Sequence, residues 1–263
     1  MMSRGRPAAR ARVLALVVVS VCLASGAAAD EVKVMTSGAF SAALLDLAPM
    51  FDRATTHKIV VATTTVGTGS SSIANRLQRG EPADVIIVAG DSVDEYIKAG
   101  TVRPGSRVDL ARSAIAMAVR AGTPVPDVSS VDAFTRVLLE AKSIAYSASV
   151  SGTYLSTELF QRLGIADRVL PKSRRIEGER VGAVIARGDA EVGFQQYSEL
   201  LPIAGLDIIT ALPPEVQRVT LFSAGIATGA NAAEAARALI AFLKSAAAAP
   251  AIRKSGLEPI TSR

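Results

Sequence analysis

The chain has 263 residues, 49% hydrophobic and 20% charged, so it is long enough for one large or two modest domains and too apolar to be intrinsically disordered. Its formal charge of +5 comes mainly from the first 29 residues, which hold four arginines and no acid; the remainder has 25 basic and 24 acidic residues. With no Trp and four Tyr, this nearly neutral body has neither a basic stripe nor stacking platforms. Nucleic acid is therefore not expected as a partner.

Residues 1–29 have the pattern of a secretory signal peptide. A basic stretch from Arg4 to Arg12 precedes an apolar run over 13–24, and small residues follow at 27–29. This run is shorter than the about 20 residues that a membrane-spanning helix needs. We predict export to the periplasm with cleavage near Ala29. An uncleaved anchor and a lipoprotein attached through Cys22 are the alternatives.

The mature chain lacks the side chains that most often bind metals or act as nucleophiles. Cys22 is the only cysteine and would leave with the leader, and His57, the only histidine, lies in a polar turn. Disulfides, cysteine-based metal sites and a thiol nucleophile are thereby excluded from the mature chain. We expect no metal site and no cofactor.

Strands and helices alternate along the chain. In chain order, the pattern predicts a strand at 32–35, a helix at 41–53 containing Pro49, a strand at 58–64, a helix at 73–78, a strand at 83–88, a helix at 91–99, a strand at 113–120, a helix at 131–140, a strand at 143–146, a helix through Leu155 and Leu163, a helix at 179–187, strands at 191–195 and 219–226, and a helix at 231–247. Repeated strand–helix units predict an α/β fold of two units with parallel sheets.

Loops of small hydroxyl residues and glycine follow three of these strands, at 36–38, 67–71 and 149–153. In an open parallel sheet, such loops lie at the carboxyl ends of the strands, where ligands bind. The free N–H groups of a helix start, together with Ser and Thr hydroxyls, suit an anion. The alternative is that these residues only cap helices. The candidate ligand residues are Thr36, Ser37, Gly38, Thr68, Gly69, Ser70, Ser71, Ser151, Gly152 and Thr153.

Enzymatic motifs are missing from the sequence. The 67–72 segment fails the dinucleotide fingerprint at its last glycine, and there is no phosphate loop and no Gly-x-Ser-x-Gly elbow. A Ser–His pair would need His57, which is expected at the far end of its strand–helix unit from those loops. Asp189 and Glu191 flank a predicted strand as a solvated turn. We therefore assign no catalytic residue and expect no enzyme.

Seven short segments, in this order and spacing, carry a resemblance: 36–40 (TSGAF), 70–74 (SSSIA), 80–85 (GEPADV), 158–164 (ELFQRLG), 188–193 (GDAEVG), 242–245 (FLKS) and 256–259 (GLEP). Together they resemble the periplasmic molybdate-binding protein family, the solute-binding components of ABC importers. The resemblance implies a two-lobed periplasmic-binding-protein fold of type II, each lobe a mainly parallel sheet flanked by helices. Lobe one would comprise 31–110 and 216–263, and lobe two 111–215, with the ligand clamped between them.

The resemblance also implies which groups bind the ligand. Ser37 and Ser70 or Ser71 would donate from lobe one, and backbone N–H groups near Gly152 and Gly178 from lobe two. Where the family often places a Tyr on the oxyanion, the chain has Gln196, with Gln195 and Tyr197 beside it.

An arginine would indicate a different ligand, because its planar fork matches a carboxylate. Arg112 lies at the predicted crossing between the lobes and is our candidate for that fork; Arg174, Arg175 and Arg180 are expected to be ordinary surface charges.

We predict an exported, monomeric binding protein that captures a small, molybdate-like oxyanion and presents it to a membrane permease. The alternatives are a di- or tricarboxylate or other organic anion as ligand, a sensory role at a membrane receptor, and an exported enzyme that uses the same cleft.

Overall fold

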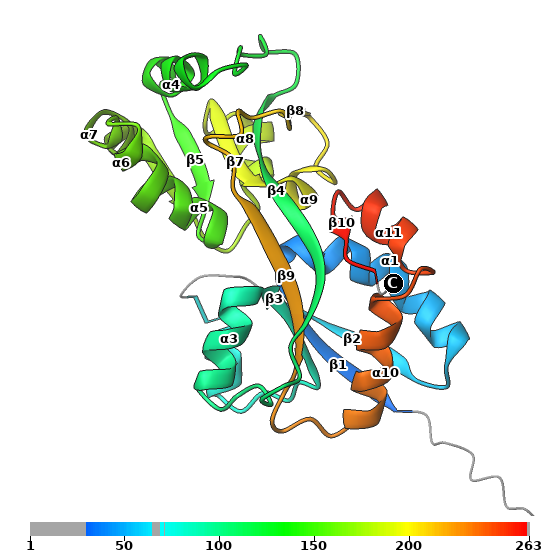
Figure 1. Cartoon of the computed structure of the whole chain (residues 1–263). Helices are drawn as coiled ribbons and strands as arrows, with labels where there is room; N and C mark the ends of the chain where they lie inside the picture. Colours follow the sequence, from blue (N-terminus) through cyan, green and yellow to red (C-terminus); the bar gives the residue numbers. More distant parts are fainter. Residues whose placement is uncertain (1–29, 65–68, 71, 262–263) are drawn as a thin grey trace, which may run out of the picture.

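The computed structural model describes residues 30–64, 69–70 and 72–261 (Figure 1). The predicted signal peptide and two candidate ligand residues, Thr68 and Ser71, lie outside the described residues. Within the described part, none of the helices is both long and apolar enough to cross a bilayer.

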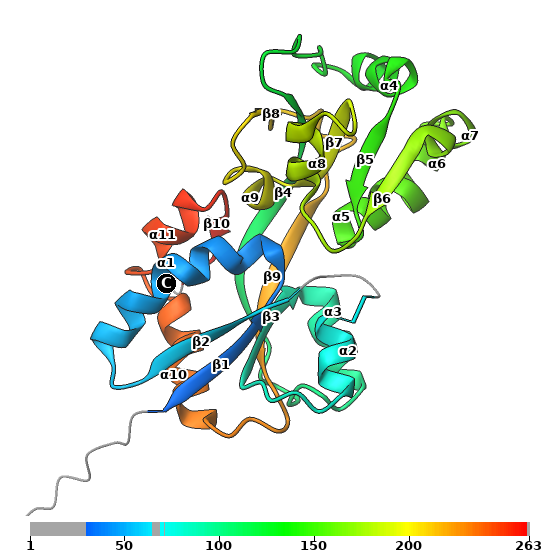
Figure 2. The same cartoon turned by 180° about the vertical axis from the view of Figure 1, so that it is seen from behind.

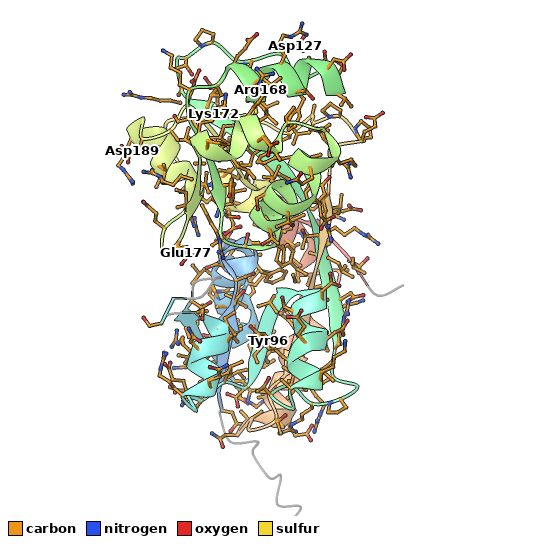
Figure 3. The ribbon with its side chains drawn as sticks, turned by 90° about the vertical axis from the view of Figure 1, so that its left-hand side faces the viewer. Tyr96, Asp127, Arg168, Lys172, Glu177 and Asp189 are labelled. Atoms are coloured by element: carbon orange, nitrogen blue, oxygen red, sulfur yellow. The ribbon has the colours of Figure 1, made fainter. Side chains whose placement is uncertain are left out.

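The chain folds into two lobes, seen from the side in Figure 3, where Tyr96 lies in the lower lobe and Asp127, Arg168, Lys172 and Asp189 lie in the upper one. The lower lobe, which we call lobe one, contains β1 (Glu31–Thr36), α1 (Gly38–Ala54), β2 (Lys58–Thr63), α2 (Ile73–Gln78), β3 (Val85–Ala89), α3 (Gly90–Lys98), β9 (Val219–Ile226), α10 (Ala233–Leu243), α11 (Ala249–Lys254) and β10 (Glu258–Pro259).

The upper lobe, lobe two, follows β4 (Val108–Arg120), which reaches from one lobe into the other. Its elements are α4 (Val131–Glu140), β5 (Ile144–Ser147), α5 (Val150–Tyr154), a π-helical turn (Leu155–Leu159), α6 (Phe160–Arg162), α7 (Ala166–Val169), a 3-10 turn (Leu170–Lys172), β6 (Ser173–Ile176), α8 (Val181–Arg187), β7 (Val192–Gln196), α9 (Tyr197–Leu200) and β8 (Leu206–Ile209).

Lobe one is a sheet covered on both faces, which explains the apolar run at 83–88. β2, β1 and β3 are parallel neighbours, and β3 continues to β9 and β4 (Figure 2). Every residue of β3 is buried. Val85 and Ile87 pack with α1 and α10, whereas Ile86 and Val88 pack with α2 and α3 on the other face. This two-sided burial is what removes the polar alternation from the strand.

Lobe two is built around β5, which pairs in parallel with β6 and β7. Its core contains aromatic side chains, including Phe134 edge-on to Phe194 at a ring-centre distance of 5.9 Å. β4 completes the sheet by pairing antiparallel to β7 and β8. The α/β, two-lobed expectation is therefore confirmed.

The pairing is mixed rather than mostly parallel, and the crossing between the lobes is the reason. β4 pairs antiparallel with β9 over residues 108–114 and with β7 over residues 115–119, so one strand belongs to both sheets. Just before β9, the Gln217 side chain accepts from the Ile115 N–H at 2.9 Å and donates to the Ile115 carbonyl at 3.0 Å. The antiparallel pairs of lobe one thus involve β4 and β9, which run side by side across the molecule (Figure 1).

Most expected elements occur where the periodicity placed them, and α4 and β9 have the expected bounds. The differences concern ends and short pieces. α1 begins at Gly38 and continues through Pro49, and β4 begins at Val108 instead of residue 113. β6, β8, β10, α7, α9 and α11 were not predicted. They are short, so hydrophobic spacing has few residues in which to appear.

Asp84, in the segment GEPADV, ties the C-terminal part of the chain to lobe one. Its buried carboxylate accepts from the backbone N–H of Lys33 at 2.8 Å, of Asn231 at 2.8 Å and of Ala232 at 3.0 Å. It therefore links β1 to the start of α10, and α10 and α11 pack against α1. The residue boundaries of the lobes stay a prediction, although this link accounts for the return of the C-terminal segment.

We expect Asp84→Ala to destabilise the fold by roughly 3 kcal/mol, because it leaves buried backbone donors without an acceptor. Urea unfolding followed by circular dichroism measures the change. Asp167→Ala is the matched control, since Asp167 is exposed at the start of α7, and it should shift the free energy of unfolding by about 0.5 kcal/mol or less. Equal effects of the two substitutions would contradict this role for Asp84.

Candidate functional site

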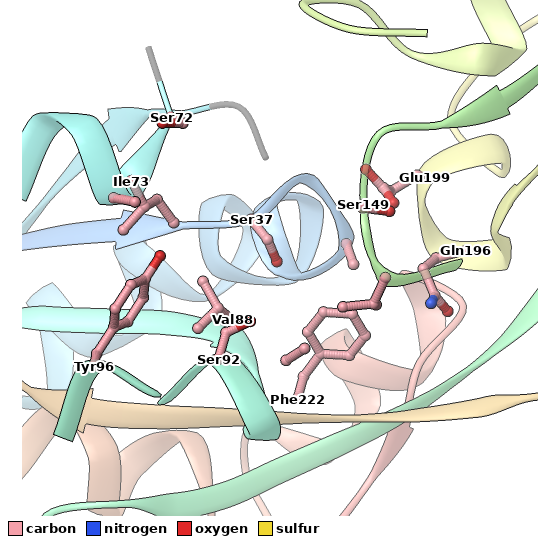
Figure 4. A pocket seen from close by; sticks show the side chains of 14 residues that line it. Ser37, Ser72, Ile73, Val88, Ser92, Tyr96, Ser149, Gln196, Glu199 and Phe222 are labelled. Atoms are coloured by element: carbon pink, nitrogen blue, oxygen red, sulfur yellow. The ribbon is translucent and has the colours of Figure 1, made fainter. Parts of the chain in front are cut away.

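Two adjoining cavities lie where the lobes face each other, at the carboxyl ends of the strands. The first, the apolar chamber, is lined mainly by hydrophobic side chains, among them Ile73, Val88, Tyr96, Val150 and Phe222 (Figure 4). The second, the polar chamber, is lined by Thr36, Ser41, Thr64, Ser147, Gly178 and Arg180, among others. Ser149 and Glu199 line both chambers, so these form two compartments of one interlobe cleft.

Helices from both lobes begin at this cleft. The lining includes residues at the starts of α1, α2 and α3 in lobe one and of α5, α8 and α9 in lobe two. The first N–H groups of a helix have no partner inside the helix and carry partial positive charge. An anion in the cleft would meet these groups from both sides, as the sequence analysis expected.

Ser37 is the strongest sign of a ligand site at the start of α1. Its backbone N–H donates to the Ile87 carbonyl at 2.9 Å, but its buried hydroxyl has no hydrogen-bond partner among the described residues and makes no cap bond. The side chain lies on the cavity wall (Figure 4). Because buried hydroxyls are nearly always satisfied, this oxygen is available to a bound molecule.

Lobe two contributes a cluster of three serines at the start of α5. The hydroxyl oxygens of Ser147 and Ser149 lie 2.7 Å apart, those of Ser147 and Ser151 2.9 Å, and those of Ser149 and Ser151 3.2 Å. Ser147 and Ser149 line the cleft, whereas Ser151 is buried behind them. Ser151 therefore holds the two lining hydroxyls in place instead of lining the cleft itself.

Arg180, at the start of α8, is the arginine of the polar chamber. Within the described part of the chain it makes no ion pair, whereas Glu179 on the same wall is held by Arg187 at 2.9 and 3.2 Å. Arg180 also acts on the cleft electrostatically, because its charge lowers the pKa of Glu199. Its planar guanidinium is thus free to bind a carboxylate in two-point fashion.

Glu199, in the short helix α9 of lobe two, reaches across to lobe one. It lies so close to Gly38, at the start of α1, that a β-carbon on Gly38 would overlap its Oε1 atom. Burial raises the pKa of Glu199 to about 7, partly offset by the charge of Arg180 and the amide of Gln195. The carboxyl group of Glu199, which both chambers share, is therefore present in both its ionised and its neutral form near pH 7.

The structure brings six of the predicted site residues to the cleft lining: Thr36, Ser37, Gly38, Gly178, Gln195 and Gln196. Gln195 also accepts from the Val181 N–H at 2.9 Å, which fixes the start of α8. The Gln196 amide is bound to the crossing strands: with its oxygen 2.8 Å from the Thr220 hydroxyl, its nitrogen lies 3.2 Å from the Ser113 carbonyl. These residues lie at, or within two residues beyond, the carboxyl ends of β1, β6 and β7.

Four predicted residues lie outside the lining for clear reasons. Gly69 and Ser70 are exposed, and the next described residues, Ser72 and Ile73, line the cavity instead. Thr153 is exposed on the outer side of α5, and Tyr197 packs against Gly256.

Gly152 likewise lines neither chamber. A β-carbon at this position would overlap the Ser147 carbonyl oxygen, so its small size serves packing and not the approach of a ligand.

Arg112 requires a correction. It lines neither chamber; its guanidinium lies 3.7 Å from the Glu258 carboxylate and is half exposed beside β10. Alternation along β4 explains this, because the neighbouring Ser113 is buried toward Gln196 while Arg112 points outward. Arg180, which the sequence analysis treated as surface charge, takes the place in the cleft that we had assigned to Arg112.

Four further residues line the cleft and were not among the predicted ligand residues: Glu199, Arg180, Tyr96 and Phe222. Only Glu199 had a usable signal, an acidic residue just beyond the apolar strand in the segment QQYSEL. No group of three or more His, Cys, Asp or Glu side chains arranged to hold a metal occurs in the described ranges.

The raised pKa of Glu199 predicts how stability depends on pH. The Glu199 carboxyl group binds its proton more tightly in the folded than in the unfolded state. Below pH 4.5 the group is protonated in both states and its burial costs no ionisation energy. Between pH 4.5 and 7 the free energy of unfolding falls by about 3 kcal/mol, and above pH 7 it stays at the lower value. Glu199→Gln should remove this loss and stabilise the protein above pH 7. Urea unfolding at pH 5 and pH 8 measures it, with the exposed Glu215→Gln as control. A stability difference between wild type and Glu199→Gln that does not change with pH would contradict the assignment.

Comparisons with known proteins agree with this architecture. Residues 32–258 match the family model for bacterial extracellular solute-binding proteins. The chain is 42% identical over 250 residues to an aconitate isomerase of a Pseudomonas species, and the match covers 95% of each chain. It is 26% identical to a molybdate-binding protein of Azotobacter vinelandii, and this match covers 89% of this chain and 92% of that one.

A solved structure shows the same fold. The periplasmic molybdate-binding protein of Azotobacter vinelandii superposes with a TM-score of 0.68 at 21% identity, covering 86% of this chain and 98% of that one. The predicted resemblance to molybdate-binding proteins is confirmed. The chain belongs to the bacterial extracellular solute-binding protein family.

Proposed function

We propose that this protein captures a small organic polycarboxylate in its interlobe cleft. The observation that carries the proposal is the joining of a polar chamber, with the unpaired Arg180, to an apolar chamber walled by Ile73, Val88 and Phe222. A tetrahedral oxyanion is polar on every side, so an apolar wall would leave some of its oxygens without donors. An organic acid has both a charged end for one chamber and a carbon skeleton for the other.

The ligand class that fits this division best is that of aconitate, which is propene-1,2,3-tricarboxylate. The 42% identical relative is named for this compound. We place its carboxylates against Arg180, the Ser37 hydroxyl and the helix starts, and its planar carbon skeleton toward Phe222. This ligand replaces the molybdate-like oxyanion of our first prediction and corresponds to the tricarboxylate alternative.

The family and the predicted leader support a cellular role. We propose that the mature protein acts in the periplasm as a monomer and delivers its ligand to the permease of an ABC importer. Closing of the lobes over the ligand would be the functional event. A sensory role would use the same closure and the same cleft.

We expect trans- and cis-aconitate to raise the melting temperature in a concentration-dependent way, with smaller shifts for molybdate and sulfate. Arg180→Ala should weaken aconitate binding about 100-fold, because a two-point charged contact is lost. Isothermal titration calorimetry measures it. Arg112→Ala is the matched control and should bind as wild type does. If Arg112→Ala loses aconitate affinity and Arg180→Ala keeps it, the proposal is contradicted and Arg112 is the arginine that binds the ligand carboxylate.

A second candidate function is isomerisation of the bound aconitate between its cis and trans forms, although our sequence analysis expected no enzyme. The name of the 42% identical relative supports it, and so does the presence of Glu199, a buried carboxyl that lines both chambers. We expect the mature protein, incubated with pure trans-aconitate, to produce the cis isomer, measured by proton NMR. Binding without turnover would leave capture as the function.

A further inference from the structure

We infer that Glu199 is the acid–base residue that moves a proton between the two end carbons of a bound propene-tricarboxylate. The inference rests on the isomerase activity of the proposed function and names the residue that would perform it.

The position of Glu199 is the first argument. Its carboxyl group comes from lobe two, contacts the start of α1 in lobe one and lines both chambers. A ligand with carboxylates in the polar chamber and carbons toward Phe222 must pass this group. Glu199 is thus placed beside the carbon skeleton and not at the far carboxylates, which is where a proton-transfer group is required.

Elimination of the other titratable groups is the second argument. Among the described residues, the ionisable side chains on the chamber walls besides Glu199 are Glu179, Arg180 and Tyr96. Glu179 is exposed and paired with Arg187, and an arginine side chain does not serve as a base in proteins. Burial raises the pKa of Tyr96 above its ordinary value, so its hydroxyl stays neutral. The first turn of α1, which packs on α9, carries no charged side chain.

One group that first removes a proton and then returns it is sufficient for this reaction. In aconitate, the methylene carbon lies next to the double bond and to a carboxylate. Glu199 takes one methylene proton, and the electron pair of the broken C–H bond spreads over the three-carbon skeleton. The proton then returns to the other end carbon, so one C–H bond breaks, one forms and the double bond moves by one position. The product is again aconitate, its new double bond either cis or trans, with no net oxidation or reduction.

The surroundings of Glu199 suit both halves of this cycle. With a pKa of about 7, the carboxyl group is present in both forms at neutral pH and can act as base and then as acid. The negative charge that spreads over the ligand in between faces the starts of α1 and α5 and the Ser37 hydroxyl, which has no other partner among the described residues. Such fixed donors stabilise developing charge without reorganising.

The decisive experiment follows aconitate in D₂O by proton NMR with the mature protein, its Glu199→Gln variant and the exposed control Glu215→Gln. Wild type and control should form the other isomer and exchange methylene protons for deuterium. Glu199→Gln should lose at least about 100-fold in both rates while keeping its aconitate-induced thermal shift. Glu199→Asp should regain part of the activity, and the wild-type rate should change with an inflection near pH 7.

Each outcome has a distinct meaning. If Glu199→Gln isomerises and exchanges as fast as wild type, or if wild type binds aconitate without exchange, the role of Glu199 is overturned and the proposed binding stands. If wild type binds no aconitate, the proposed function fails together with the inference. Circular dichroism melts of Glu199→Gln guard against misfolding, because this variant should be at least as stable as wild type above pH 7.

Discussion

The contact between the start of α1 and the buried carboxyl group of Glu199 joins the two lobes at the cleft. A helix start has unsatisfied N–H groups and attracts negative charge, while burial makes the ionised carboxylate costly. The pKa of about 7 reflects burial resisting ionisation, with Arg180 and Gln195 offsetting part of it. Gly38 is required here for a steric reason, since any side chain would displace the carboxyl group. The remaining features of the site are arranged around this contact.

The crossing strands connect this site to the relative position of the lobes. β4 takes part in both sheets, Gln217 brackets Ile115 at the point where it changes partners, and Gln196 spans Ser113 and Thr220 from the cleft side. The Gln196 side chain therefore lines the apolar chamber, while its amide oxygen and nitrogen bind the crossing strands. A movement of the lobes relative to each other would change the contacts of Gln196. At this position the family resemblance often places a tyrosine.

The cleft of this chain is divided into a polar and an apolar chamber. Hydroxyl groups and helix starts alone would form a cage suited to a small oxyanion. The apolar wall formed by Ile73, Val88 and Phe222, together with the unpaired guanidinium of Arg180, instead suits a ligand with a carbon skeleton. One scaffold can bind an inorganic oxyanion or an organic acid, because the N–H groups at the helix starts attract the negative charge of either ligand.

The sequence by itself determined the strand–helix alternation, the helix starts that face the cleft at Ser37 and Ser149, and the family resemblance. These follow from local spacing and from loops of small residues, which need no knowledge of distant contacts. Only the tertiary structure decided that β4 pairs with β9 and with β7 of the other lobe, that Gly152 serves packing, and that Arg180 and not Arg112 faces the cleft. The burial of Glu199 likewise required the other lobe. The physical reason is that side-chain direction along a strand and the desolvation of a carboxyl group depend on partners far away in sequence.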